Sequence, residues 1–401
     1  MHRCFKLLRL ILTATLLIAI LLIADMNRLN APQEIGKHHL FSILDWELRR
    51  LPNKWYYKIQ SSFGDNDETK YKRLENIYTY FNKQHNNLDK LSRLDVEASI
   101  ESLISDAIKL EGLTYLDGII FPPVLITLES APNILVTSPR DKIKRGEEAL
   151  LNSNLSLHQA VSIENKLLEQ ENLSSLVIPI GGIATYPVMV NKTDDIMWSL
   201  QTAAHEWVHT FLFFKPIGFN IFKSPEMQIL NETVANTVGK EIGFSAFNLL
   251  LKERYKSTDL CELIKHTATK PNGKFNFSNE MNETRLNVER LLAEGKIEKA
   301  ESYMDNQQLF FSLNGYPIRK LNQAYFAFYG TYADSPASIS IIGPQVNQYR
   351  SHFDNLEEFI REISRITSYQ EFKKSLAYLN VKDPSLKNTY TDSTVIPFIC
   401  Q

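Results

Sequence analysis

Residues 200–214, LQTAAHEWVHTFLFF, restrict the possible folds of this chain more than any other segment. His205 and His209 are four residues apart, so on an α-helix their side chains project from one face, one turn apart. Two imidazoles at this spacing can bind a single metal ion. Glu206 lies about 100° round the helix from His205, where it can reach a water molecule at the metal without being a ligand. The surrounding apolar residues predict a helix that packs in the core.

A catalytic zinc site needs three protein ligands and an open position, so the histidine pair requires one more ligand. Glu232 lies in SPEMQILNETVANTVGKEIG, a segment whose apolar residues recur at helical spacing. A second helix lying across the first could present Glu232 to the metal. Asn236, one turn further on the same side, could orient a ligating imidazole. The sequence therefore predicts one Zn²⁺ ion bound by His205, His209 and Glu232.

HEWVH followed by NETVAN resembles the gluzincin pattern of zinc metallopeptidases. The nearer likeness is to a bacterial family assigned as zinc aminopeptidases, in which the HE-x-x-H helix precedes N-E-x-x-A…V…G. The matching residues here are Asn231, Glu232, Ala235, Val238 and Gly243. LNQAYFAFYGTYADSP is similar to a later Asn-rich, Tyr-containing segment of that family. Trp207 replaces the small residue that usually follows HE, and the G-x-M-E-N motif that binds a free α-amine in well-studied aminopeptidases is absent.

This resemblance implies a zinc-dependent peptidase in which Glu206 is the general base, taking the proton of the attacking water and delivering it to the leaving group. Zincins often place a Tyr or His side chain at the developing oxyanion. The candidates are Tyr325, Tyr329 and Tyr332, with Asn322 and His266 behind them. Tyr329, followed by Gly330, is preferred. Each tyrosine is equally well explained as a core aromatic residue at helical spacing.

Three β-type runs precede the metal-binding helix: VLITLES, NILVTSP and SLVIPIGGIATYPVMV. In related zinc peptidases an edge strand just before this helix pairs with extended substrate. Gly181 and Gly182 would permit close backbone approach there, and Pro179 and Pro187 suit an edge strand. We therefore expect Gly181 and Gly182 to lie on the substrate-binding strand.

The predicted fold class is α+β and zincin-like, with a small mixed sheet whose edge strand lies over the HExxH helix, a mostly helical C-terminal part and an N-terminal transmembrane helix. Helical periodicity in TKYKRLENIYTYFNKQ and SIESLISDAIKLEG predicts a helical region before the sheet. The expected divisions are an N-terminal tip and anchor (1–25), a linker (26–36), a helical part (37–115) and a catalytic domain (116–401). Within the last, we expect the sheet at 120–190, the metal-site helices at 193–243 and further helices at 244–401.

The N-terminus carries an apolar run, LLRLILTATLLIAILLIA, preceded by basic residues. Such a segment is either a cleaved signal peptide or an uncleaved signal anchor, and the length of the run favours the anchor. Positive charge before the run favours a cytoplasmic N-terminus. The sequence thus predicts a single-pass protein of the cell membrane with an extracytoplasmic catalytic domain.

Composition excludes several other classes of function. The net charge is −2 and the pI about 6.5, so no basic excess marks a nucleic-acid-binding protein. The cysteines are Cys4, Cys261 and Cys400, and without a C-x-x-C pair they cannot form a thiolate zinc ribbon. Cys261 and Cys400 are either a disulfide pair or two unrelated thiols. The expected partner is a peptide or protein substrate. The alternatives are a zinc hydrolase of a non-peptide amide or ester, and a non-catalytic zinc-binding protein.

Overall fold

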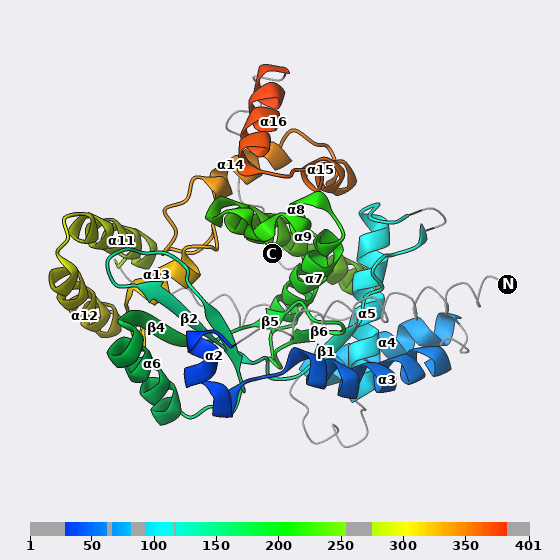
Figure 1. Cartoon of the computed structure of the whole chain (residues 1–401). Coiled ribbons are helices and arrows are strands. Elements are labelled where there is room, and N and C mark those ends of the chain that lie inside the picture. The colour runs from blue at the N-terminus through cyan, green and yellow to red at the C-terminus, as the bar shows by residue number, and fades with distance from the viewer. Residues whose placement is uncertain (1–28, 62–65, 82–92, 116–117, 254–274, 383–401) are drawn as a thin grey trace.

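The structure is a computed structural model that describes residues 29–61, 66–81, 93–115, 118–253 and 275–382. Helices predominate and surround small sheets, which confirms the α+β class (Figure 1). The helices are α2 (Ala31–Ile35), η1 (Lys37–His39), α3 (Ile43–Ser61), α4 (Asn66–Phe81), α5 (Arg93–Leu110), α6 (Leu157–Glu171), α7 (Ile196–Phe213), α8 (Pro216–Phe219), η4 (Ile221–Lys223), α9 (Pro225–Glu253), α11 (Phe277–Ala293), α12 (Ile297–Leu313), α13 (Gln323–Tyr329), α14 (Ile342–Arg350), α15 (Leu356–Ile363) and α16 (Tyr369–Lys382). The strands are β1 (Ile126–Leu128), β2 (Asn133–Pro139), β3 (Glu148–Leu151), β4 (Leu173–Pro179), β5 (Gly182–Ile183) and β6 (Val188–Val190).

The strands form two sheets, where the sequence predicted one. One is antiparallel in the order β3-β2-β4, and the other is mixed in the order β1-β6-β5. The single predicted run SLVIPIGGIATYPVMV divides between them because β4 ends at Pro179, which has no N–H to continue a ladder. The Asn191 side chain then donates to the Ile180 carbonyl oxygen at 2.7 Å, at the point where the chain passes into the mixed sheet.

The largest core surrounds α7 and α9, which pack against α5, the β1-β6 pair and the C-terminal helices α14 to α16. The region predicted as a separate helical part, 37–115, contributes α5 to this same core. Carboxylates of α5 also complete the outer edge of β1: Glu97 accepts from the Leu128 N–H at 2.8 Å, and Glu101 from the Ile126 N–H at 2.9 Å. Buried Lys54 of α3 forms ion pairs with both, which compensates their burial.

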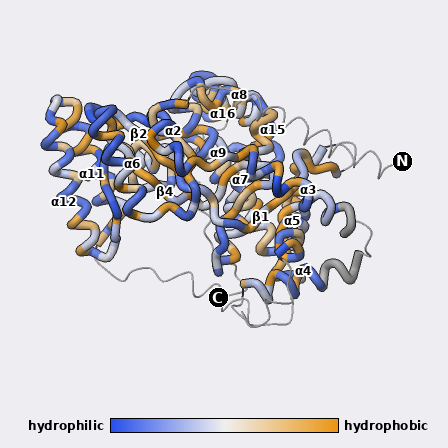
Figure 2. The backbone as a smooth tube through the Cα atoms, turned by 60° about the horizontal axis from the view of Figure 1, so that its bottom comes forward, coloured by the Kyte–Doolittle hydropathy of each residue, from blue (hydrophilic) through white to orange (hydrophobic). Residues whose placement is uncertain are grey.

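The antiparallel sheet is the centre of a second lobe, on the left of Figure 1. Side chains alternate along β2, so Leu135 packs toward α6, whereas Ile134 and Val136 pack toward α13. Helices α11 and α12 lie beyond α13 and have a core of their own around Phe311 and Phe326. Figure 2 shows hydrophobic and hydrophilic positions alternating along the outer helices, as expected where one face of each is buried.

The predicted linker, 26–36, is partly helical. Asn30 begins α2 with a reciprocal capping box, in which its side chain accepts from the Gln33 N–H and the Gln33 side chain accepts from the Asn30 N–H. Pro32 in the first turn has no N–H to leave unpaired. These local signals, together with packing of α2 against α6 and β3, make the segment part of the second lobe.

No helix in the described part of the chain is long and apolar enough to cross a membrane. Even α7 and α9, which run through the core, carry polar residues such as His205 and Glu232 at intervals. The fold class predicted with an N-terminal transmembrane helix is corrected accordingly to α+β, with helices around two small sheets. The segment predicted as the anchor, residues 1–25, lies outside the described residues.

Candidate metal centre

Helix α7 presents the histidines of the HExxH segment on one side and packs in the core with the other. Its N-terminus is capped by Asp195, whose side chain accepts from the Trp198 N–H at 2.9 Å. The His205 and His209 side chains are mostly buried and face the same side, with ring centroids 4.6 Å apart and an interplanar angle of 82°. Trp207 points away into the core, where its indole N–H donates to the Pro122 carbonyl oxygen at 2.9 Å. Trp207, which stands where the resembled family usually has a small residue, therefore faces the core and not the histidine side of the helix.

Helix α9 crosses α7 at very short range because glycines occupy the contact. A Cβ at Gly239 would lie 2.8 Å from the Cα of His205, and a Cβ at Gly243 would lie 2.8 Å from the Cα of Gln201. Any larger residue at these positions would separate the two helices. Glu232, two turns before Gly239 on α9, is thereby placed against the histidine pair.

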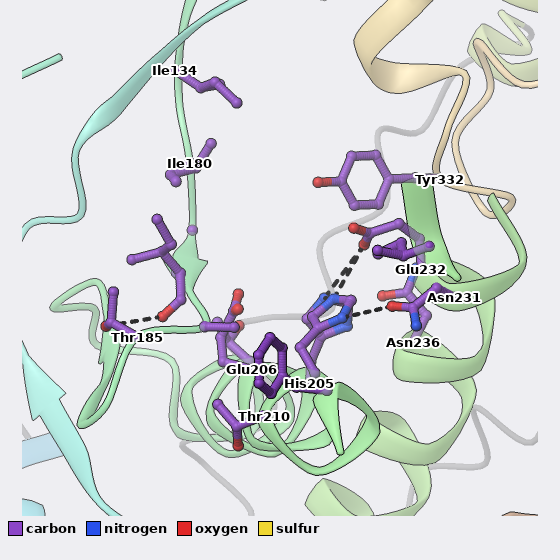
Figure 3. Close-up of a pocket in the computed structure, with 18 of the residues that line it drawn as sticks. Ile134, Ile180, Thr185, His205, Glu206, Thr210, Asn231, Glu232, Asn236 and Tyr332 are labelled. Atoms are coloured by element: carbon purple, nitrogen blue, oxygen red, sulfur yellow. Dashed lines mark hydrogen bonds and ion pairs between the residues drawn. The ribbon is translucent and has the colours of Figure 1, made fainter. Parts of the chain in front are cut away.

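Three donor atoms converge at this crossing. The Nε2 atoms of His205 and His209 are 3.0 Å apart, and Oε2 of Glu232 lies 3.7 Å from the first and 3.4 Å from the second. Zinc ligands at about 2.0–2.1 Å in a tetrahedral arrangement are about 3.3 Å from one another. Figure 3 shows the His205 ring and the Glu232 carboxylate turned toward one another. This donor set fits a divalent cation, and it is the set predicted from the sequence.

The surroundings of the three ligands suit a cation. Burial lowers the pKa of His205 to about 4, which keeps its ring neutral. Burial opposes ionisation of Glu232, but attraction to His209, whose own pKa is raised to about 9, outweighs it and lowers the pKa of Glu232 to about 2. Among the described residues, no group donates a hydrogen bond to the buried Oε2 of Glu232. A buried carboxylate oxygen without a donor is costly unless a cation satisfies it.

Two asparagines of α9 interact with the imidazoles. Asn231 Oδ1 lies 3.0 Å from His209 Nδ1, so Nδ1–H donates and Nε2 is the ring nitrogen that faces Glu232. Asn236, the residue predicted to orient a ligand, lines the same site and favours the protonated form of His205 against the effect of burial. Asn231 was not among the predicted site residues, although it precedes Glu232 directly in the NE pair. Its role depends on the crossing angle of the helices, which the sequence does not show.

Glu206 lies beside the histidines, under the β5 strand. A Cβ at Gly182 would be 2.8 Å from Glu206 Oε1, so the glycine backbone rests directly on this carboxylate. Burial raises the pKa of Glu206 to about 8. A carboxylate with a pKa near neutrality is suited to accepting and releasing a proton. Gly181 lies on the indole of Trp198. A Cβ at Gly181 would be 2.9 Å from this ring.

A cleft of about 780 Å³ opens over the three side chains of the metal site, His205, His209 and Glu232 (the metal cluster), and over the β5 strand. Tyr329 and Tyr332 line it, whereas Tyr325 packs between α13 and the sheet and does not. Figure 3 shows the Tyr332 hydroxyl above Glu232, pointing across the cleft. Burial raises the pKa of Tyr332 well above its ordinary value, and Glu232 and Glu206 raise it further. Both tyrosines therefore remain candidates, and Tyr332 is the one on which Glu232 and Glu206 act electrostatically.

Other predicted residues are more distant. Asn322 caps α13 by accepting from the Tyr325 N–H and donates to the Ser175 carbonyl oxygen, so it is structural. His266, Cys4, Cys261 and Cys400 lie outside the described residues.

Sequence reasoning also missed three charged residues of the cleft, Arg145, Glu47 and Lys240. Arg145 forms an ion pair with Glu148 and lies over the ring of Phe328 at 5.3 Å. Glu47 comes from α3, far away in the sequence, and accepts from the Tyr186 N–H at 2.8 Å. None of the three positions belongs to a recognisable motif.

Comparison with protein-family models, curated proteins and solved structures finds no match to this chain. The resemblance to the gluzincin pattern therefore stays a prediction, carried by the His205–His209–Glu232 geometry and by Glu206.

Proposed function

We propose that this protein is a zinc-dependent metallopeptidase. The observation that carries the proposal is the triangle of donor atoms from His205, His209 and Glu232, with the Glu206 carboxylate beside it. When bound, a zinc ion supplies a Lewis acid that polarises a carbonyl group and lowers the pKa of a water molecule. Glu206 takes the proton of the attacking water and transfers it to the departing amine.

Tyr332 is the residue best suited to stabilise the negative charge that develops on the substrate carbonyl oxygen. Its hydroxyl points into the cleft above Glu232, and its raised pKa keeps it a proton donor at neutral pH (Figure 3). A donor already fixed in a largely buried cleft needs no reorganisation during the reaction. Tyr332 is therefore preferred to Tyr329 in this role.

The β5 edge favours a peptide over a non-peptide amide or ester. The Asn191 N–H donates to the Gly181 carbonyl oxygen at 2.9 Å, which makes Gly181 and Asn191 a hydrogen-bonded antiparallel pair. Bonding alternates along such a pair, so the N–H and C=O of Gly182, opposite Val190, point away from β6. These free groups line the cleft beside Glu206 and can pair with an extended peptide backbone.

The test compares the full-length protein with its Glu206→Gln variant, using a fluorescence-quenched peptide library and zinc analysis of both. We expect both proteins to bind one zinc ion, and the variant to lose roughly two to four orders of magnitude in turnover. A chelator should abolish the activity, and zinc should restore it. Zinc binding by both proteins without peptide cleavage by either contradicts the proposal and favours a non-catalytic site, or a non-peptide substrate if esters or other amides are hydrolysed.

A further inference from the structure

The cleft continues beyond the metal cluster along α7. Glu206, Thr210 and Phe213 follow one another at spacings of four and three residues, so their side chains form a row on one face of the helix. All of them line the cleft. A helix rises about 1.5 Å per residue, which places Phe213 roughly 10 Å from Glu206 along the axis. The row leads from the proposed general base to a cluster of aromatic residues.

This aromatic cluster is built where α8 and η4 fold back onto the end of α7. A Cβ at Gly218 would lie 2.0 Å from the Leu212 carbonyl oxygen, so only glycine permits this approach. The ring of Phe213 consequently lies 5.2 Å from that of Phe214 and 6.1 Å from that of Phe219, measured between centroids. Phe222 of η4 adds a further ring to the wall of the cleft.

Two threonine hydroxyl groups of the cleft, those of Thr210 and Thr185, are already engaged by the backbone. Thr210 Oγ1 donates to the Trp207 carbonyl oxygen at 2.7 Å, and Thr185 Oγ1 donates to the Pro187 carbonyl oxygen at 2.7 Å. With their donors used in this way, both threonines offer the cleft mainly their methyl groups. This part of the wall is therefore apolar.

The charged side chains of the cleft outside the metal cluster have other partners. Arg145 is paired with Glu148, and Lys240 with Asp334. In the chain, η4 precedes α9, whereas Lys240 follows Glu232 on that helix. Lys240 and η4 therefore lie on opposite sides of Glu232 along α9. Glu47 is buried and accepts from the Tyr186 N–H. None of these charges belongs to the part of the cleft wall formed by Thr210, Phe213 and Phe222.

Exposure distinguishes the members of the cluster. Phe222 is 84% exposed, Phe219 70% and Phe213 38%. Single exposed aromatic residues are ordinary, but neighbouring ones that continue an apolar cleft are typical of a binding surface. Phe213, Phe214 and Phe222 line the cleft, whereas Phe219 belongs to the same surface but lies outside the cleft. Phe219 thus provides a matched control.

We infer that Phe213, Phe214 and Phe222 form a subsite that selects substrates with a large apolar side chain, aromatic or long aliphatic, close to the scissile bond. An extended peptide advances about 3.4 Å per residue, so about two residues of peptide together with the length of a large side chain span the roughly 10 Å from Glu206 to Phe213. The occupant is the substrate because the subsite is continuous with the cleft that holds the proposed catalytic groups. The inference rests on the proposed peptidase function.

The test uses the full-length protein and its Phe222→Ala and Phe219→Ala variants. The substrates are end-blocked hexa-alanine peptides with Phe, Lys or Asp placed at each position in turn, and the readout is kcat/KM with cleavage sites from mass spectrometry. We expect preferred cleavage beside Phe, and a roughly tenfold lower kcat/KM for these peptides in Phe222→Ala. Cleavage of all-alanine peptide should change by less than about twofold. Phe219→Ala, whose ring packs on Phe213 but does not line the cleft, should have the smaller effect of the two.

A binding measurement separates this inference from the proposed function. In the Glu206→Gln background, fluorescence polarisation should show tighter binding of the Phe peptide than of the Asp or Lys peptide. Phe222→Ala should remove that difference. An absence of chelator-sensitive cleavage contradicts the peptidase function and leaves the binding result to decide the subsite.

Three outcomes overturn the inference even if peptides are cleaved. The first is a preference for Lys or Asp peptides, and the second is an equal loss of activity in Phe222→Ala and Phe219→Ala. The third is that both variants lose binding to phosphatidylcholine vesicles equally while the peptide preference is unchanged, which would assign the phenylalanines to a lipid surface.

Discussion

Gly239 of α9 packs directly on the backbone of His205 of α7. A Cβ at this glycine would be 2.8 Å from both the backbone nitrogen and the Cα of the histidine. The absence of a side chain at Gly239 therefore sets the distance between the two helices. It also sets the position of Glu232 relative to the imidazoles. A residue remote from the metal-binding atoms thus controls whether the third ligand can reach them.

Gly239→Ala should weaken metal binding although no ligand is changed. Overpacking at a helix contact costs about 1–3 kcal/mol, and part of this cost will be relieved by moving α9 away from His205. We expect the affinity for zinc to fall by about tenfold or more, as found for changes that displace ligands. Competition with a chromophoric chelator measures this, together with thermal unfolding.

Lys240→Ala is the matched control for this change. Lys240 is the next residue on α9, but its side chain reaches outward to Asp334. This variant should retain its zinc affinity. Equal affinities in Gly239→Ala and in the unmodified protein would show that the helix contact does not set the ligand geometry.

Asn231→Ala should also reduce zinc affinity, through His209. The Asn231 side chain accepts from Nδ1–H of the imidazole at 3.0 Å and so keeps Nε2 available as a ligand. Loss of such an outer hydrogen bond lowers metal affinity by about 10–100-fold. Asn248→Ala, on the same helix but outside the metal site, should have no effect. An unchanged affinity in Asn231→Ala would mean that α7 alone orients the ring.

The parts of the site set by local spacing were predictable from the sequence. His205, Glu206 and His209 are fixed relative to one another by the helix itself, and the pattern of apolar residues showed that helix clearly. Glu232 was also predicted, because its segment has helical period and a carboxylate completes the expected ligand set. Such inferences need only the geometry of one helix and the chemistry of the metal.

The parts set by contacts between distant segments could not be predicted. Nothing in the sequence distinguishes Gly239 from another helical glycine before α7 is placed against it. The division of 176–190 between two sheets depends on the strands with which β4 and β6 pair. Tyr329 and Tyr332 are separated by less than one helical turn, so the sequence could not tell which one faces Glu232. Glu47 enters the cleft from α3 solely because that helix packs beside Tyr186.

Gly182→Val should impair turnover while leaving zinc content unchanged. The new Cβ would meet Glu206 Oε1 at 2.8 Å and push either the carboxylate or the β5 strand aside. Because the atoms nearest to the new Cβ belong to Glu206 and to the Met189 carbonyl group, and not to a zinc ligand, the donor triangle should persist. We expect kcat/KM to fall by roughly a hundredfold, since a displacement of about 1 Å at a reacting group has that effect.

Ile183→Val, a conservative change at the next residue of β5, is the control for Gly182→Val and should keep most of the activity. Metal analysis accompanies both variants. Loss of zinc from Gly182→Val would show that the strand supports the ligands, and normal turnover would exclude close substrate approach at this edge.

Glu47 should make the stability of the protein depend on pH. Burial raises the pKa of Glu47 from 4.5 to about 7 in the folded state, against the opposing effect of the Tyr186 N–H. The folded protein therefore binds this proton more tightly than the unfolded chain does. The resulting stabilisation is fully present below pH 4.5 and is lost as the pH rises through 7, by up to about 3 kcal/mol.

Glu47→Gln removes this titration but keeps an oxygen that can accept from the Tyr186 N–H. The free energy of unfolding of the variant, relative to that of the unmodified protein, should therefore increase between pH 5 and pH 8. Urea unfolding at both pH values measures the difference, and pH effects of all other groups cancel in the comparison. Parallel stability curves for the two proteins would mean that Glu47 titrates alike in the folded and unfolded states, and that its side chain is hydrated within the cleft.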